Sequence, residues 1–332
     1  MGHRKYSAPR RGSLAFLPRS RAKSLESRIR NWPDVNSEKP VLTGFAGFKA
    51  GGIQVMTVDD REKTPNFGKN LMNPSTVVAT PPMTIIGIRG YKEDVYSKKA
   101  IFDIYAKDLP KELSRKFKTK QNDENMKKSE SLIDETSSIV AIVSISPKDV
   151  NLSQKKPFVF EIGVSAKDNR SKYDYLLSLL GKEVKVSEVF QTGQNIDVSG
   201  ITRGKGVEGP VTRYGVKRKQ HKSRKSVRAV GTLGPISPAV VMYTVARQGQ
   251  RGFHQRTEYN KRILKMSDIS KEESNRINPP GGFKHFGLVK GEYIILRGSI
   301  PGVPKRLVKM RTPIRKLQKK ISEPKVIEVL AK

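Results

Sequence analysis

Six residues in the middle of the chain match the glycine pattern of dinucleotide-binding sites and are the first candidates for chemistry. They form the run Gly204-Lys205-Gly206-Val207-Glu208-Gly209. A dinucleotide site needs a strand before this pattern, an apolar helix that opens at it, and an acidic residue about 20 residues later. Here Pro210 and a polar, basic run follow, and position 229 is alanine. We therefore reject the dinucleotide interpretation and expect these glycines to provide flexibility and close backbone packing.

Other residue patterns that perform catalysis are also missing. A P-loop needs Gly-Lys followed by Ser or Thr, whereas the Gly-Lys pairs at 68, 181 and 204 are followed by Asn, Glu and Gly. The chain has no Cys, which excludes disulfides, thiolate-bound zinc, iron–sulfur clusters and a Cys nucleophile. The adjacent pair Asp59-Asp60 would face opposite ways on a strand, so a shared acid–base site is not expected there.

Histidine spacing gives no metal site either. His3, His221, His254 and His285 have no second His three or four residues away, as a helical pair of ligands requires. His254 lies in the basic run 249–256, and three roles are open for it: a phosphate or base contact, a structural hydrogen bond in a loop, or a catalytic base. We expect no enzyme activity, no metal, no cofactor and no small-molecule substrate.

The distribution of charge indicates a different chemistry, the binding of a polyanion. Lys and Arg number 65 against 31 Asp and Glu, a net charge of +34. Residues 61–200 hold 23 basic and 18 acidic residues, a net of only +5. The excess gathers in three segments: nine basic residues with Glu26 in 1–30, ten with Glu208 in 200–228, and eight with no acid in 305–320. This pattern is typical of a globular body with nucleic-acid-binding arms.

The composition of these segments favours arms over a solvated face. Residues 1–24 have no hydrophobic period, and residues 200–226 are rich in glycine with few large apolar groups. Such segments cannot bury enough apolar surface to offset the entropy of ordering them. We expect them to order against a polyanion, where Lys and Arg release condensed counterions.

Aromatic residues near the basic segments are candidates for stacking on RNA bases. Tyr214, Phe253 and Tyr259 lie among basic residues, and unstacked bases commonly lie on aromatic rings. For Trp32 a core or hinge-packing role is at least as favoured as stacking. Three phenylalanines near glycines are expected in the core: Phe45, Phe48 and Phe67.

Short strands with glycine-rich turns are predicted for most of the remaining chain. Strands are expected within 41–58 and at 77–80, 83–89, 138–146, 158–165, 184–190, 196–201, 239–245 and 293–297, with 303–310 a further candidate. Helices are expected at 100–117, broken by Pro110, and at 171–180, ended by Gly181. Residues 118–135 are expected to form a helix end or a loop. The pattern favours a mainly β fold, a barrel or sandwich, with an α+β unit inserted at 83–180.

Several residue runs, in order along nearly the whole chain, resemble one known family. They are His3–Leu14 with Phe16–Arg19, Gly44-Phe45, Lys49-Ala50-Gly51, Thr80–Met83 with Gly87-Ile88, Gly200–Gly206, Val245–Gln250 with Gly252–Glu258, and Ile277–Pro279 with Gly281–Phe283. Together they resemble universal large-subunit (50S) ribosomal protein three, in its archaeal and eukaryotic form. The absence of Cys and the modest length resemble the archaeal type.

The resemblance implies a fold and a function. The fold would be a six-stranded translation-protein β-barrel with an inserted α+β domain and long basic RNA-binding extensions. The protein would be a structural constituent of the large ribosomal subunit in the cytoplasm, binding 23S rRNA and neighbouring ribosomal proteins. It would nucleate early subunit assembly and extend a basic loop toward the peptidyl transferase centre, near the elongation-factor binding region.

The resemblance also implies domain boundaries. These are a basic N-terminal extension at 1–36, the first part of the barrel at 37–82, the inserted α+β domain at 83–180, the barrel continued at 181–200, a basic central loop at 201–245, the barrel completed at 246–318, and a C-terminal tail at 319–332.

On this hypothesis the basic segments clamp rRNA by its backbone. The rRNA-binding candidates are His3, Arg4, Lys5, Arg10, Arg11, Arg19 and Arg21 in the N-terminal arm, then Arg203, Lys205, Arg213, Lys217, Arg218, Lys219, Lys222, Arg224, Lys225 and Arg228 in the central loop, and Arg247, Gln248, Gln250, Arg251, His254 and Arg256 where the loop returns. The loop tip near the peptidyl transferase centre would be Pro235, Ile236 and Ser237.

The loop tip departs from the family pattern. Relatives commonly carry a segment of the type Gly-Ala-Trp-His-Pro-Ala, whereas this chain has Gly-Pro-Ile-Ser-Pro-Ala at 234–239. An aromatic tip stacked on RNA is therefore not expected. Ile236 can make apolar contact only, and Pro235 and Pro238 are expected to hold the tip rigid instead.

Other functions remain as alternatives. A free-standing RNA chaperone or assembly factor would share the basic segments, and an RNA-acting enzyme would also need a catalytic pair or cofactor loop that the sequence lacks. A membrane-surface protein would need an amphipathic helix beside its basic runs, and none is predicted. No stretch approaches the roughly 18 apolar residues that span a bilayer, and no signal peptide is recognised, so a cytosolic protein is expected.

Overall fold

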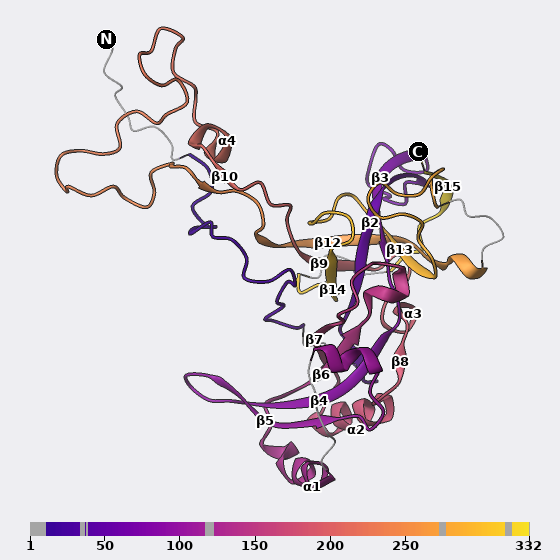
Figure 1. The fold of residues 1–332 in the computed structure, drawn as a ribbon. Coiled ribbons are helices and arrows are strands. Elements are labelled where there is room, and N and C mark those ends of the chain that lie inside the picture. The colour runs from indigo at the N-terminus through magenta and orange to yellow at the C-terminus, as the bar shows by residue number, and fades with distance from the viewer. Residues whose placement is uncertain are drawn as a thin grey trace. The chain divides into compact units, whose positions relative to one another are not determined.

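The computed structural model describes residues 11–33, 37, 39–116, 123–271, 277–315 and 321–331. The chain divides into two compact units. The larger unit comprises residues 25–200 and 256–332, and the smaller unit comprises residues 1–24 and 201–255. Each unit is described by itself. The fold is mainly β, with several sheets (Figure 1).

One sheet of the larger unit carries the inserted α+β region. Its strand order is β1-β7-β6-β4-β5, and β8 pairs with β4. The strands are β1 (Val41–Leu42), β4 (Met83–Glu93), β5 (Lys98–Tyr105), β6 (Ser138–Ile145), β7 (Phe158–Ser165) and β8 (Glu183–Val184). Helix α1 (Asp123–Leu132) packs against β5, and α2 (Asn169–Leu179) packs against β6 and β4. Short helices occur at Lys111–Arg115, Ile133–Glu135, Pro147–Val150 and, as α3, Val186–Val189.

The other sheet of the larger unit closes on itself. Its order is β14-β9-β12-β13-β3-β2-β15, and β14 also pairs with β2, which completes a ring of six strands. The strands are β2 (Gly44–Val58), β3 (Asn70–Ala79), β9 (Asn195–Ile201), β12 (Gln255–Asp268), β13 (Glu292–Arg297), β14 (Leu307–Arg311) and β15 (Val326–Leu330). The ring is uneven, because β14 pairs with β2 over its full length but with β9 only at Lys309–Arg311.

The larger of two hydrophobic clusters contains residues of both sheets. The Phe48 ring on β2 lies 6.0 Å from the Phe158 ring on β7, and the buried cluster includes residues of both sheets. Trp32 packs on two glycines: a Cβ at Gly44 would lie 2.5 Å from the Trp32 ring, and a Cβ at Gly163 would lie 2.6 Å from it. The core-packing role considered for Trp32 is therefore the one observed.

Two of the three phenylalanines expected in the core are there, and one is not. Phe45 and Phe48 are fully buried, whereas the Phe67 side chain is 53% exposed. Phe67 lies in the turn between β2 and β3, where its backbone N–H donates to Thr64. The neighbouring glycine did not indicate that Phe67 is buried. Gly68 has φ +75° and allows this exposed turn to form; it does not provide space for close packing in the core.

Most predicted strands are confirmed, but three predicted elements are wrong. Residues 98–105 form β5 instead of a helix, because Arg89 of β4 lies opposite Asp103 and binds it. Residues 186–189 form the short helix α3 where a strand was predicted. Residues 239–245 form no strand, since no partner strand pairs with this apolar segment and much of it is exposed. The helix predicted at 171–180 is confirmed, and Gly181 follows it with φ +79°.

Two further strands of the larger unit were missed, β12 and β15. β12 is rich in charged residues and shows no alternation of apolar and polar side chains, so the sequence gives no strand signal; it forms because β9 and β13 flank it. β15 falls in the segment predicted as a tail and pairs with β2.

In its described part, the smaller unit is mostly irregular chain around three short elements. Strand β10 (Val207–Glu208) pairs with β11 (Gly249–Gln250). Helix α4 (Pro210–Tyr214) follows β10 directly, with Pro210 in its first turn and Gly215 as its left-handed C-terminal residue. The G-x-G-x-x-G run thus opens into a five-residue helix, which is too short to hold a dinucleotide in the way the pattern would require.

Candidate RNA interface

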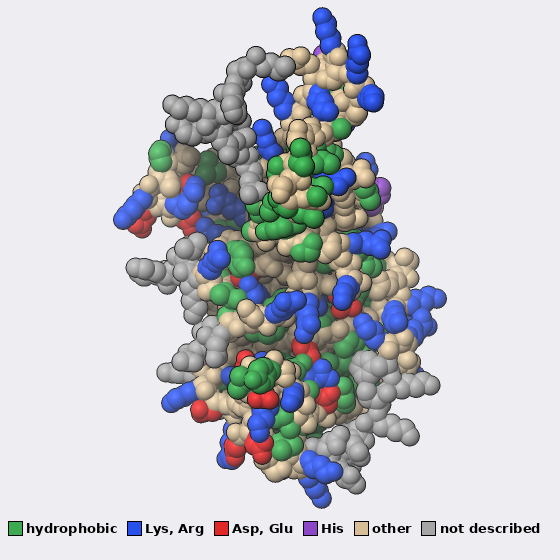
Figure 2. Space-filling view, turned by 90° about the vertical axis from the view of Figure 1, so that its left-hand side faces the viewer, with side chains coloured by type: hydrophobic (Ala, Val, Ile, Leu, Met, Phe, Trp, Pro, Cys, Tyr) green, Lys and Arg blue, Asp and Glu red, His purple; other side chains and the backbone are tan. Residues whose placement is uncertain are grey.

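The smaller unit concentrates positive charge to an unusual degree. Its two segments, 1–24 and 201–255, contain 19 Lys and Arg but only one acidic residue, Glu208, a net of +18. Lys and Arg side chains also far outnumber Asp and Glu on the face of the molecule drawn in Figure 2. A field of this sign and density selects for a polyanionic ligand.

A short ladder closes the base of the central loop. Val207 pairs with Gln250 and Glu208 pairs with Gly249, and the Arg251 guanidinium lies 2.6 Å from the Glu208 carboxylate. Gly252 follows with φ +71°, and a Cβ there would collide with the Arg203 carbonyl oxygen. The only acidic residue of the unit is thus engaged in holding the loop base, and Gly252 is required by both its conformation and its surroundings.

Arg213 organises the backbone of the smaller unit. Its Nε donates to the Gln250 carbonyl oxygen at 3.0 Å, its Nη1 to that of Arg247 at 3.2 Å, and its Nη2 to that of Arg19 at 3.3 Å. Arg19 returns the contact, donating from Nη1 to the Arg213 carbonyl oxygen at 2.9 Å. The planar guanidinium suits this task because its fixed fork can satisfy several carbonyls at once.

Tyr214 adds an aromatic surface beneath the same arginines. The Arg19 guanidinium carbon lies 4.2 Å from the Tyr214 ring centroid, and that of Arg213 lies 5.2 Å from it. These are cation–π distances. Arg19, Arg213 and Tyr214 are predicted to contact RNA, and in the structure they also contact one another. We refer to these three residues as the arginine–tyrosine node.

His254 makes a structural hydrogen bond in the loop. Its Nδ1 lies 2.9 Å from the Ser20 carbonyl oxygen. The His254 backbone N–H donates to Thr202 Oγ1, and the Thr202 N–H donates to the His254 carbonyl oxygen. Because a carbonyl oxygen only accepts, Nδ1 carries the proton in this contact.

Most other predicted contact residues present exposed side chains. In the N-terminal segment these are Arg11 and Arg21; in the loop they are Arg203, Lys205, Lys217, Arg218, Lys219, Lys222, Arg224, Lys225, Arg228, Arg247 and Gln248. Arg228 also donates to Thr212 Oγ1 at 3.2 Å. Gln250 is half-buried and donates to the Gly252 carbonyl oxygen at 2.9 Å. His3, Arg4, Lys5 and Arg10 lie outside the described residues, and Arg256 lies on β12 in the larger unit.

The predicted loop tip is fully open to solvent. Pro235, Ile236 and Ser237 are all exposed, and the Ile236 side chain is 96% exposed. An apolar side chain so exposed gains nothing from the protein itself, so it is available to another surface.

The third basic segment, 305–320, is not an arm in its described part. Lys309 and Arg311 lie on β14 and are buried. Arg311 donates from Nη2 to Asp197 at 3.2 Å, and Asp197 is completely buried. Lys309 lies 3.9 Å from Glu26 and 4.2 Å from the Phe160 ring centroid. Burial lowers the pKa of Lys309 to about 8. The charge count alone could not separate these internal cations from ligand-binding ones.

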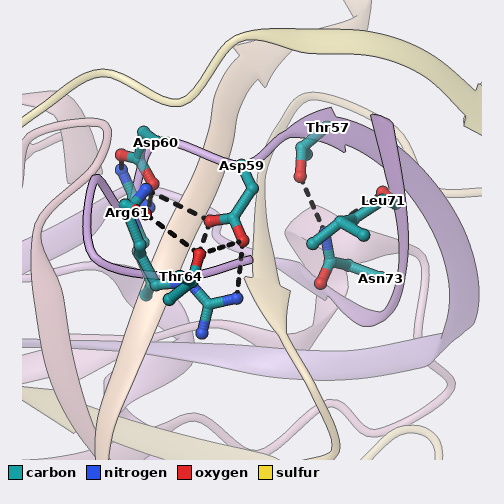
Figure 3. A network of polar contacts seen from close by, with 8 residues as sticks. Thr57, Asp59, Asp60, Arg61, Thr64, Leu71 and Asn73 are labelled. Atoms are coloured by element: carbon teal, nitrogen blue, oxygen red, sulfur yellow. Dashed lines mark hydrogen bonds and ion pairs between the residues drawn. The ribbon is translucent and has the colours of Figure 1, made fainter. Parts of the chain in front are cut away.

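The adjacent acidic pair does not form a shared site. Asp59 accepts from Arg61 at 2.7 Å and from Thr64 at 3.2 Å, as Figure 3 shows. Asp60 instead pairs with Arg262 and accepts from Ser322. The Arg61 hydrogen bond holds the pKa of Asp59 well below its usual range, and the Arg262 hydrogen bond lowers that of Asp60 to about 2. The two carboxylates thus bind different partners, but not for the reason expected from sequence, because both residues follow the end of β2 and do not lie on a strand.

Within the described ranges, no three His, Asp or Glu side chains are grouped to hold a metal ion. Among the helices in that part of the chain, none is both long and apolar enough to cross a membrane.

Comparison with known proteins gives consistent matches along the whole chain. The family model described as "Ribosomal protein L3" matches residues 1–331. This chain is similar to archaeal proteins named "Large ribosomal subunit protein uL3", of which three are described here. That of Methanococcoides burtonii is 41% identical over 336 residues, covering 99% of this chain and 97% of the relative.

The other two relatives agree. That of Caldivirga maquilingensis is 45% identical over 325 residues, covering 94% of this chain and 91% of the relative. That of Pyrobaculum aerophilum is 42% identical over 337 residues, covering 98% of each. Similarity of this extent over nearly the full length of both partners identifies the family. The chain belongs to the ribosomal protein L3 family.

Proposed function

We propose that this protein is a structural constituent of the large ribosomal subunit that binds 23S rRNA through its smaller unit. The observation that carries the proposal is the smaller unit's 19 basic residues against one acidic residue. Membership of the ribosomal protein L3 family supports the same role. The protein acts in translation as part of a cytoplasmic ribonucleoprotein and performs no catalysis.

The proposed mechanism divides the basic residues into two groups. The arginine–tyrosine node and the Arg251–Glu208 pair shape the loop base. The exposed cations of the loop then contact phosphates, because their side chains face solvent instead of the protein. Pre-ordering the loop base reduces the conformational entropy lost on binding. Recognition is mainly of RNA shape and backbone, since the A-form major groove is closed to side chains.

His254 would contribute an rRNA contact through its second ring nitrogen. Nδ1 is engaged with the Ser20 carbonyl oxygen, which leaves Nε2 for the RNA. The contact expected from sequence, with a phosphate or a base, therefore remains the proposal for this residue.

The larger unit would serve as the folded body. We propose that the ring of β14, β9, β12, β13, β3 and β2 is the six-stranded translation-protein barrel of the family, supported by its pairing order. The proposed boundaries are those expected from sequence: extension 1–36, barrel 37–82, 181–200 and 246–318, inserted domain 83–180, central loop 201–245 and tail 319–332. The tip Pro235–Ser237 would point toward the peptidyl transferase centre, near the elongation-factor binding region. The protein would also contact neighbouring ribosomal proteins and nucleate early assembly.

Salt-dependent binding to a large-subunit rRNA transcript tests the clamping mechanism. If about 10 phosphates are neutralised, the logarithm of the binding constant should fall with the logarithm of salt concentration at a slope near −7 to −9. Replacing Lys217, Arg218 and Lys219 by Gln should reduce the magnitude of that slope by about 2 to 3. The matched control replaces three exposed lysines of the larger unit, Lys98, Lys99 and Lys155, and should leave the slope unchanged. A wild-type slope shallower than about −3 would contradict the clamp.

Sedimentation of native lysate tests the role in the ribosome. The chain should travel with large subunits and whole ribosomes at moderate salt. Recovery only in light ribonucleoprotein fractions would instead support the alternative, a free-standing RNA chaperone or assembly factor.

A further inference from the structure

We propose that the smaller unit contains a pocket for one unpaired RNA base, with Tyr243 as its stacking surface. This inference rests on the RNA-binding function proposed above and names the kind of RNA element that this part of the interface recognises.

The pocket has the volume and lining of a binding site. It encloses about 560 Å³, within the usual range of small-molecule sites. Its apolar lining comes from two stretches of chain far apart in sequence, Leu17-Pro18 and Val241-Met242-Tyr243 with Val245. The remaining lining residues are Arg19, Arg213, Tyr214 and Arg247.

The apolar wall of this pocket is uncovered. Val240, Val241, Met242 and Tyr243 are consecutive and exposed, and the Tyr243 side chain is 75% exposed. Apolar side chains also reach the surface among Lys and Arg side chains on the face drawn in Figure 2. Exposed apolar residues that adjoin one another in this way mark interaction sites more often than isolated ones.

Charge identifies the occupant as RNA. All three charged residues that line the pocket are arginines, and no Asp or Glu lines it. The Arg247 guanidinium makes no hydrogen bond or ion pair with any other described residue, although its carbonyl oxygen accepts from Arg213. A base in the pocket would therefore place its flanking phosphate beside an available guanidinium.

The two tyrosines of the pocket have different roles. Tyr214 already has two arginine guanidinium groups against its ring, so it forms part of the pocket's support. Tyr243 has no such partner among the described residues and remains exposed. Stacking on an open aromatic ring is favourable for any base, which predicts a site that is tolerant of sequence.

Paired binding measurements with two short RNA probes test this directly. One probe is oligouridylate, and the other has the same ribose–phosphate backbone without bases. The full-length wild type should bind oligouridylate about 10-fold more tightly than the abasic strand, the amount expected from one stacked base. Y243A should lose this preference while it keeps the affinity for the abasic strand, because the phosphate contacts remain.

Two further variants separate stacking from general effects. Y243F should keep the preference because the ring is retained. Y96A removes a tyrosine that is 94% exposed in the larger unit, and it should also keep the preference. Circular dichroism of each variant checks that the fold is intact, as expected for substitutions at exposed positions.

Several outcomes would overturn the base pocket. Equal wild-type affinity for the two probes would exclude base recognition while leaving backbone clamping intact. If Y243A kept the preference for oligouridylate, another part of the surface would be responsible for base recognition. Photocross-linking of Tyr243 to a peptide of another protein in intact large subunits would identify a protein occupant. Failure to bind either probe at low salt would overturn both this inference and the proposed function.

Discussion

Arg19 and Arg213 each donate a side-chain hydrogen bond to the other's backbone carbonyl oxygen, at 2.9 Å and 3.3 Å. The two residues are 194 positions apart in the chain. Their reciprocal contact ties the N-terminal segment to the start of the central loop within the smaller unit. Two cations can lie so close because each satisfies carbonyl dipoles and both pack against the Tyr214 ring.

We expect the order of the loop base to depend on the hydrogen bonds of the Arg213 guanidinium more than on its charge. R213K keeps the charge but loses the fork that reaches three carbonyls. We expect both R213K and R213A to lower the free energy of local opening by about 2–3 kcal/mol, from roughly 1 kcal/mol per hydrogen bond. Hydrogen exchange at residues 207–214 and 247–252 measures this opening.

The control for Arg213 is Arg218, whose side chain is exposed. R218A should weaken RNA binding without changing hydrogen exchange at the loop base. If R213K exchanges like the wild type, the organising role of the guanidinium fork is wrong.

Gly252 should not tolerate a side chain. G252A adds a Cβ that collides with the Arg203 carbonyl oxygen at a residue with φ +71°, so the ladder between β10 and β11 should distort and RNA affinity should fall. G231A is the matched control, because a Cβ there meets nothing within 4 Å. Wild-type exchange at Val207 and Glu208 in G252A would show that the loop base does not depend on this glycine.

Removing only one partner of the buried ion pair Asp197–Arg311 should strongly lower the free energy of unfolding. Asp197 also accepts from the backbone N–H groups of Asn260 and Ile314. D197A leaves a buried, uncompensated guanidinium and should lower the free energy of unfolding by about 3–5 kcal/mol. D134A removes an exposed partner of Arg170 and should leave the melting temperature almost unchanged. Denaturant titration measures the free energy of unfolding of D197A and D134A. Equal losses in the two variants would contradict the idea that burial makes the Asp197–Arg311 pair important.

Lys309 should make stability depend on pH in a defined window. Its folded-state pKa of about 8 lies below the ordinary value of 10.5 because burial disfavours the charged form. Between pH 8 and pH 10.5 the unfolded chain therefore binds more protons than the folded protein, so stability rises with pH. The free-energy cost of burying the charged Lys309 is complete below pH 8 and disappears as the pH approaches 10.5. K309M should be more stable than the wild type by about 3 kcal/mol at neutral pH. The two curves should converge by pH 10.5.

The wild-type minus K309M difference isolates Lys309 from the other titrating groups. K325M is the matched control, because its exposed side chain carries no comparable burial penalty. A difference that stays constant from neutral to alkaline pH would mean that Lys309 titrates normally.

Local chemistry in the sequence was sufficient to predict several features. Strands such as β6 and β7 are dense in β-branched and aromatic residues and are confirmed. Gly181 ends α2 as predicted because a left-handed residue is needed there. The charge excess of 1–24 and 201–255 is a property of composition, so it is visible before any folding.

Other features depended on pairing between distant segments. β12 is strongly charged and has no strand period of its own; hydrogen bonding to its neighbours makes it a strand. The segment 239–245 has strand-like residues but no partner, so it remains irregular and contributes to a pocket. Whether a segment forms a strand depends on the strands that pair with it, and the sequence of that one segment does not specify them.

The sequence by itself determined that this protein is strongly basic, lacks Cys chemistry and belongs to one recognisable family, because composition and ordered motifs require no coordinates. Only the tertiary structure decided which cations are available to a ligand. Lys309 and Arg311 are buried, Arg19 and Arg213 bind backbone carbonyls, and the exposed cations of 217–225 face solvent. The physical reason is that every Lys and Arg carries the same charge, whereas its partner depends on which distant segment folding brings beside it.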